Sequence, residues 1–420
     1  MVSDLNGPTM TINTKDALFT SDTPTVAQPT DTSTGFLKLL VTLLFACLFL
    51  FSDFYYTDIG RPFDYLALIL LLLIVMLYKS NPPPKLRVNA VLLFSLLLPW
   101  CIAGFWNESA LAAIAIMVGA GYVVPLSVSV VAAVRGEILD RAIFLTLIVS
   151  LAIFYLQSGV YVATGIFIDI PQLAGSIESR GLNEALGYFR PSGIFQEPNA
   201  YCTVMFSLGT VYALMGRRWR YLEILLILSF LLSRSLWGFG AGAVLFGMLY
   251  GARYTFVAVI VGGFAVALLY LTVGMDIEGL TASSTTASRI FGIFDDASAQ
   301  ARFGQMSNFE FGTALLAGSG VDTTNFQDFG ANGIAFMLYC FGLGGAAAIL
   351  LFYKIFLKIK LRTAVSVGIL LTTYPPFSYM YFWFWLATMV LLEFCSNNQP
   401  PAAFHGSQNS SFKPNSQRYS

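Results

Sequence analysis

Apolar runs of about 20 residues recur along the chain between Gly35 and Phe394, and short polar segments separate them. A helix of that length is long enough to cross the hydrocarbon core of a bilayer. The pattern therefore predicts an all-α polytopic membrane protein with about 12 (11–12) transmembrane helices. We place them at 36–52, 63–78, 88–106, 110–134, 142–165, 198–215, 221–236, 237–252, 254–274, 331–353, 363–377 and 378–394.

The last pair of runs leaves two topologies open. Residues 363–394 must cross twice, although two full crossings need about 40 residues. Pro375 and Pro376 indicate either a tight outer turn or a kink in one long helix. The second alternative would leave eleven spans and would place the C-terminal tail on the outer side.

The composition agrees with a membrane protein and argues against a large soluble helical protein. Hydrophobic residues make up 56% of the chain, charged residues only 11%, and the mean hydropathy is +0.71. A soluble domain carries about 25% charged residues. The formal net charge of zero says nothing about partners, and we expect no nucleic acid among them. The five cysteines lie in or at the end of apolar runs without metal-ligand spacing, so we expect no metal and no cofactor.

Polar tails flank the apolar region. Residues 1–34 are rich in Thr, Ser, Asp and Pro, and residues 396–420 are similarly polar. Such segments cannot bury enough apolar surface to fold, which predicts disordered tails on a transmembrane domain at 35–395. Two long outer loops are expected within that domain, at 166–198 and 275–330, and long loops commonly carry function.

The distribution of basic residues orients the chain. With the N-terminus inside, short inner loops hold most of the Lys and Arg, as the positive-inside rule requires. No lysine falls outside. Arginine presents a planar fork of donors that matches phosphate and carboxylate, so the outer face is predicted to bind an anion. The outer basic residues are Arg61, Arg180, Arg190, Arg234, Arg289 and Arg302.

The segment from Arg190 to Ala200, with the sequence RPSGIFQEPNA, closes the first long loop. Proline and glycine near its start predict a turn, and Pro198 suits the first turn of the following helix. Glu197 would then stand at a helix start that faces the outer water layer. Arg190 and Glu197 could bind an anion and accept a proton there. The alternative is a structural salt bridge that pins the loop.

A second arginine ends the apolar run that begins near Tyr221. At about 1.5 Å per residue, Arg234 would lie roughly 20 Å above the inner edge of a core about 30 Å thick. An arginine inside the membrane is costly and suggests a functional site. The alternative is that the side chain reaches up to the outer headgroups.

The second long loop contributes a third, weaker signal. Arg289 and Arg302 flank Asp295 and Asp296, although paired carboxylates in a loop are usually just solvated. The sequence GSGVD then ends at Asp322 and precedes the next apolar run. A turn of this kind carries little information by itself.

The order of these motifs resembles the O-antigen polymerase/ligase superfamily, which includes Wzy-type bacterial polysaccharide polymerases. The resemblance covers about 161–351 and rests on loose motifs in a shared order. It implies a GT-C-like fold in the bacterial inner membrane, with its active side in the periplasm. It also implies a glycosyltransferase that joins oligosaccharides carried on undecaprenyl pyrophosphate. A flippase and a chain-length regulator would be partners besides the bilayer.

The resemblance also assigns roles to residues. Arg190, Arg234 and Arg302 match the arginines that hold the pyrophosphate, whereas Arg180 and Arg289 match less well. Ligases of the superfamily share a histidine near the end of the second long loop. The single histidine of this chain, His405, lies in the tail, which favours a polymerase over a ligase.

We therefore expect metal-independent glycosyl transfer in which Glu197 is the first candidate base and Asp322 the second. Two further functional classes remain open. A lipid-linked oligosaccharide transporter would place its site near the bilayer midplane and often shows two similar halves. A GT-C enzyme that uses a polyprenyl monophosphate sugar would use acidic residues of the first outer loop, where Asp53 and Asp58 lie.

Overall fold

A computed structural model gives the fold. It describes residues 31–56, 59–78, 84–134, 136–178, 182–183, 188–215, 219–251, 253, 316–322, 333–352, 360–372 and 379–398. The described residues are mostly helical, so the predicted all-α fold class is confirmed. The predicted span at 254–274 and most of the predicted loop at 275–330 lie outside the described residues.

The helices follow the apolar runs closely. The run expected at 198–215 forms a helix with those same bounds, and the pair expected to meet near 236 forms two helices that are separated by a short corner. The elements of the first half are α1 (Asp31–Phe45), η1 (Ala46–Leu50), α2 (Pro62–Leu77), α3 (Pro84–Trp106), α4 (Ala110–Val118), η2 (Gly119–Val123), α5 (Val124–Val134) and α6 (Glu137–Thr164).

The second half begins with short elements in the first long loop. These are α7 (Ile170–Leu173) and a two-stranded antiparallel pair of β1 (Leu182–Asn183) and β2 (Tyr188–Phe189), in which Leu182 faces Phe189. The remaining helices are α8 (Pro198–Met215), α9 (Arg220–Leu232), α10 (Leu236–Tyr250), α16 (Gly333–Phe352), α17 (Leu361–Leu371) and α18 (Met380–Asn398).

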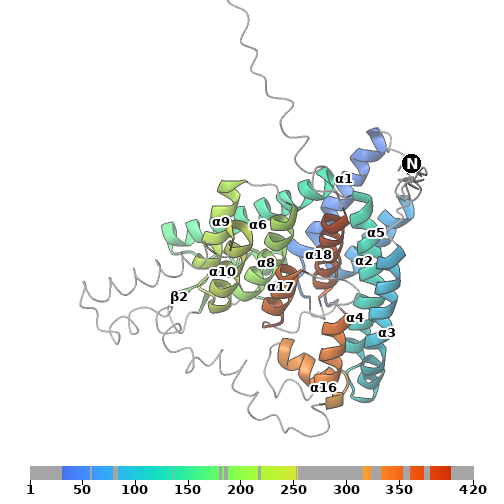
Figure 1. Cartoon of the computed structure of the whole chain (residues 1–420). Coiled ribbons are helices and arrows are strands. Elements are labelled where there is room, and N and C mark those ends of the chain that lie inside the picture. The colour runs from blue at the N-terminus through green and yellow to red at the C-terminus, as the bar shows by residue number, and fades with distance from the viewer. Residues whose placement is uncertain are drawn as a thin grey trace, which may run out of the picture.

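Helix α18 is central to the packing. It lies between α8 and α5 and contacts both (Figure 1). Its aromatic side chains Trp383 and Trp385 are almost fully buried, and the indole of Trp385 donates to the hydroxyl of Thr210 on α8 at 2.9 Å. Large aromatic rings bury more apolar surface than other side chains and contribute strongly to the stability of a core. The C-terminal helix therefore joins the two halves of the chain.

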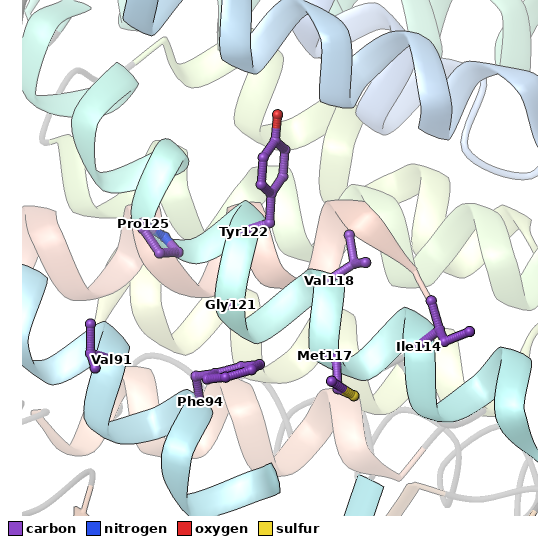
Figure 2. Close-up of a pocket in the computed structure, with 8 residues that line it drawn as sticks. All are labelled: Val91, Phe94, Ile114, Met117, Val118, Gly121, Tyr122 and Pro125. Atoms are coloured by element: carbon purple, nitrogen blue, oxygen red, sulfur yellow. The ribbon is translucent and has the colours of Figure 1, made fainter. Parts of the chain in front are cut away.

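A single helix runs through α4, η2 and α5 and contains one π-helical turn. Gly119 begins that turn, and a Cβ atom there would overlap the Trp383 ring of α18. Two residues further, a Cβ atom on Gly121 would come within 2.7 Å of the Phe94 ring. An apolar hollow of about 380 Å³ lies beside this contact, with Phe94 and Met117 on its wall (Figure 2). The small residues thus let two neighbouring helices approach closely.

Helices α17 and α18 form an antiparallel pair. The backbone N–H of Lys360, just before α17, donates to a carboxylate oxygen of Glu393 near the end of α18 at 2.9 Å. The start of α17 therefore lies beside the end of α18, an arrangement that differs from one long kinked helix. The residues between the two helices, with Pro375 and Pro376, lie outside the described ranges. Helix α17 itself has 11 residues, about 16 Å of helix.

Hydrogen bonds join segments that the charge pattern places on the same outer side. The phenol of Tyr56, in the first outer loop, donates to the carbonyl oxygen of Ala174 at 3.0 Å. The side-chain amide of Asn107, in the second, donates to the carbonyl oxygen of Ser319 at 2.8 Å. Each of these contacts joins two segments that are more than 100 residues apart in the sequence. The side of the membrane on which they lie and the number of spans stay predictions.

Two described helices are long and apolar enough to cross a membrane, Ala110–Val134 and Glu137–Thr164. Several shorter helices carry apolar residues outward. On α9 the side chains that face outward are between 42% and 85% exposed, while Leu226 and Phe230 on the other face are fully buried. Soluble monomers rarely expose a continuous apolar stripe of this kind. The outward residues are Tyr221, Ile224, Leu225, Leu228, Leu231 and Leu232.

Candidate functional site

The turn that follows Arg190 is held by a side chain of α6. The side-chain oxygen of Gln157 accepts from the backbone N–H groups of Ser192 and Gly193, at 3.0 and 2.9 Å. Gly193 has φ of +64°, which glycine adopts without strain. The amide nitrogen of Gln157 donates to the carbonyl oxygen of Ile168 at 2.8 Å. Both ends of the described loop are thus fixed to one buried amide.

The corner between α9 and α10 contains Ser233, Arg234 and Ser235. The hydroxyl of Ser235 caps α10 by accepting from the N–H of Gly238 at 3.2 Å, and it donates to the side-chain oxygen of Asn199 at 3.4 Å. Asn199 lies in the first turn of α8. The N-termini of α8 and α10 therefore meet, and each helix N-terminus carries partial positive charge. Such an arrangement favours an anion nearby.

Arg234 occupies the corner in a left-handed conformation, with φ of +52°. A residue other than glycine rarely adopts this conformation, and where it does the surrounding structure must hold it. A guanidinium nitrogen of Arg234 donates to the carbonyl oxygen of Phe189 at 3.4 Å. Since Phe189 directly precedes Arg190, the structure brings these two predicted site residues into one region.

Arg190 itself is half-buried. Its charge acts on the thiol of Cys202, on the second turn of α8, and that thiol donates to the hydroxyl of Ser233 at 3.1 Å. Arg190 thus lies between the start of α8 and the corner that carries Arg234. Two of the five predicted pyrophosphate-binding arginines are described, and both lie beside the paired helix starts. The other three, Arg180, Arg289 and Arg302, lie outside the described residues.

Glu197 precedes the first residue of α8, as predicted, and its carbonyl oxygen accepts from the N–H of Tyr201 at 3.1 Å. The neighbouring backbone N–H of Gln196 donates to a carboxylate oxygen of Asp53 at 2.9 Å. Burial, together with the charge of Glu197, raises the Asp53 pKa from 3.8 to about 6, although the Gln196 bond and Arg61 oppose that rise. Two carboxylates therefore lie close together at the start of α8.

Arg61 fixes the same loop from its other end. Its guanidinium lies 4.0 Å from the centre of the Tyr379 ring, which directly precedes α18. This is a cation–π contact, and it links the start of α2 to the start of α18. The charge of Arg61 also acts on Asp53 and Asp64. The sequence pattern left Arg61 without a role, and the structure gives it one in holding the first outer loop.

Asp322 lies in another part of the structure than Glu197. Its carboxylate accepts from the phenol of Tyr339 on α16 at 3.1 Å, and the residue is buried. The segment before it is bound by α3 and α16, since Gly320 donates to the carbonyl oxygen of Cys340 and Val321 to that of Trp100, both at 3.0 Å. Glu197, by contrast, stands at the start of α8 beside the first outer loop. Of the two predicted candidate bases, Glu197 is therefore the one that shares a region with Arg190 and Arg234.

Sequence reasoning missed Gln157 and Tyr379 as parts of this site, and it named Asp53 only for the alternative of a GT-C enzyme that uses a polyprenyl monophosphate sugar. A lone amide in the middle of an apolar run was the available signal for Gln157, because polar groups are retained in such runs when they have a partner. Nothing in the sequence pairs Asp53 with Gln196 or Arg61 with Tyr379. Within the described ranges, no three His, Cys, Asp or Glu side chains gather as metal ligands do.

No protein-family model matches this chain, and no curated protein matches its sequence with significant similarity.

Proposed function

We propose that this protein is a polysaccharide polymerase of the bacterial inner membrane. It would join oligosaccharide repeat units, carried on undecaprenyl pyrophosphate, at the periplasmic face. The exposed apolar stripe on α9 supports a membrane setting, because its residues face outward at helical spacing. The resemblance of the motif order to the O-antigen polymerase/ligase superfamily supports the reaction class.

One observation carries the proposal most. The Arg190 turn and the Arg234 corner are joined by a hydrogen bond, and both lie beside the paired starts of α8 and α10. Two arginines and two helix N-termini offer a donor set that suits a pyrophosphate. Glu197 stands at the same helix start and supplies a carboxylate for the acceptor sugar.

In the proposed reaction an acceptor hydroxyl oxygen attacks the anomeric carbon of the growing chain. A new C–O bond forms as the bond from that carbon to the pyrophosphate oxygen breaks, and the leaving group keeps the electron pair. The hydroxyl proton passes to Glu197 and then to water. Negative charge grows on the pyrophosphate in the transition state, so fixed cations there lower the barrier. Direct displacement inverts the anomeric configuration.

The test replaces Arg190 and Arg234 singly by Lys and by Ala and measures polymer length in cells that carry only the variant. We expect single repeats to accumulate on the lipid, because lysine lacks the planar fork. Arg220→Ala is the matched control, since Arg220 begins α9 at the end opposite to Arg234. Full polymerisation by both lysine variants would remove the fork from the mechanism.

A second measurement separates the polymerase from a transporter. Glu197→Gln should abolish polymerisation while leaving binding of the lipid-linked oligosaccharide nearly unchanged, because the amide cannot take a proton. A transporter would instead move lipid-linked oligosaccharide across a vesicle membrane without lengthening it. Unchanged polymer length in the Glu197→Gln variant would exclude this residue as the base.

A further inference from the structure

The first outer loop packs against the loop that contains the candidate site. The backbone N–H of Tyr55 donates to the hydroxyl of Ser176 at 3.1 Å, and that hydroxyl donates to the carbonyl oxygen of Tyr55 at 3.0 Å. The side-chain amide of Gln196 also donates to the Ser176 hydroxyl, at 3.4 Å. The two bonds between Tyr55 and Ser176 join residues that are 121 positions apart in the sequence. Hydrogen bonds therefore hold the first outer loop against the segment that leads into α8.

In this loop, Asp53 contacts the residue next to Glu197. Its carboxylate accepts the backbone N–H of Gln196 at 2.9 Å, one residue before Glu197. The turn that carries Glu197 is thereby tied to the end of the first helical hairpin. Arg61 holds the other end of the loop through the ring of Tyr379 at 4.0 Å.

We propose that Asp53 is a positioning residue for Glu197: its carboxylate fixes the Gln196–Glu197 turn and lies near enough to the Glu197 carboxylate for the two charges to interact. This inference rests on the proposed function, in which Glu197 takes the acceptor proton. Like charges held close together oppose ionisation, and the charge of Glu197 opposes the ionisation of Asp53.

The groups that face Asp53 set the strength of this coupling. Glu197 and Arg61 act on its charge from the start of α8 and the start of α2. Tyr381, on α18, interacts electrostatically with Asp53, and it interacts in the same way with Tyr379 and Asp64. Among the described groups of this set Arg61 is the cation, and its effect on the Asp53 carboxylate is larger than that of Glu197.

The first experiment follows the Asp53 carboxyl by infrared titration of the purified wild-type protein and of Glu197→Gln. The midpoint of Asp53 should lie near 6 in the wild type and fall in the variant, because the neighbouring negative charge is gone. The Asp53→Asn variant identifies the band by its loss. Equal midpoints in the wild type and Glu197→Gln would overturn the proposal.

The second experiment measures the polymerisation rate. Asp53→Asn keeps an oxygen that can accept from Gln196 and should retain most of the rate, whereas Asp53→Ala should lose most of it, because the turn that carries Glu197 is released. Asp169→Ala is the matched control and should leave the rate nearly unchanged, since Asp169 caps α7 through the N–H of Gln172 at 3.1 Å. Equal rates in Asp53→Asn and Asp53→Ala would overturn the positioning role.

Hydrogen exchange tests the fixing of the turn without any substrate. The Asn side-chain oxygen of Asp53→Asn should still accept from Gln196 and keep that amide protected, whereas Asp53→Ala should lose the protection. Equal protection of the Gln196 amide in both variants would show that the Asp53 side chain does not hold the turn. If the wild type makes no polymer, the proposed function fails, while the infrared and exchange results still decide whether Asp53 and Glu197 are coupled.

Discussion

Arg234 donates to the carbonyl oxygen of Phe189 at 3.4 Å across 45 residues of sequence. The contact joins the corner between α9 and α10 to the residue that precedes Arg190. The backbone of Arg234 is left-handed, which disfavours any side chain by about 1–2 kcal/mol. A strained residue that carries a charge to a shared site fits a functional role better than a structural one.

Replacing Arg234 by glycine should separate stability from function. Glycine relieves the left-handed strain, so thermal stability in detergent should stay equal or rise, by less than about 1 kcal/mol. Polymerisation should be lost because the guanidinium is gone. Glu108→Gly is the control, since Glu108 has φ of +56° on the predicted outer side. That variant should keep polymerisation, and a large loss of stability in Arg234→Gly would show that the side chain is structural.

The sequence predicted the helices well because each apolar run carries its own signal. The run at 110–134 and the corner near Arg234 appear where the pattern places them. The site was only half predictable. Arg190 and Glu197 lie in a recognisable turn, but the amide that holds this turn, Gln157, lies 33 residues before Arg190. Residues that are paired only by tertiary contacts show no local spacing in the sequence from which the pairing could be predicted.

Replacing the uncharged Gln157 should disturb both the stability of the fold and the candidate site. Leucine in its place would leave the N–H groups of Ser192 and Gly193 buried without their acceptor, which costs about 1–3 kcal/mol for each group. We expect Gln157→Leu to lower the unfolding temperature and to abolish polymerisation. Ser158→Ala serves as the control, because the Ser158 hydroxyl donates to the carbonyl oxygen of Phe154 in its own helix, at 2.8 Å. Equal behaviour of both variants would show that the turn holds itself.

The tight packing of the segment before Asp322 depends on two glycines with positive φ. Gly318 has φ of +79° and Gly320 has φ of +81°, and a Cβ atom would overlap the Cys340 backbone or the Ala103 side chain. Alanine at either position should destabilise the fold by roughly 2–4 kcal/mol through strain and overlap together. Gly159→Ala is the control, because a Cβ atom there meets nothing within 4 Å. Thermal unfolding of the purified variants measures the difference.

The Asp53 carboxyl should make the fold more stable at mildly acid pH. Its pKa is about 6 in the folded protein against an ordinary value of 3.8, so the folded state takes up a proton before the unfolded chain does. Stability therefore rises as pH falls from about 7 towards 4, and the charged form opposes folding above that window. The Asp53→Asn variant lacks this titration. Its unfolding temperature should exceed that of the wild type at pH 7.5, and the difference should shrink steadily towards pH 4. Parallel curves for the two proteins would mean that Asp53 titrates at its ordinary pKa, and the burial and the charge of Glu197 would then have no net effect on it.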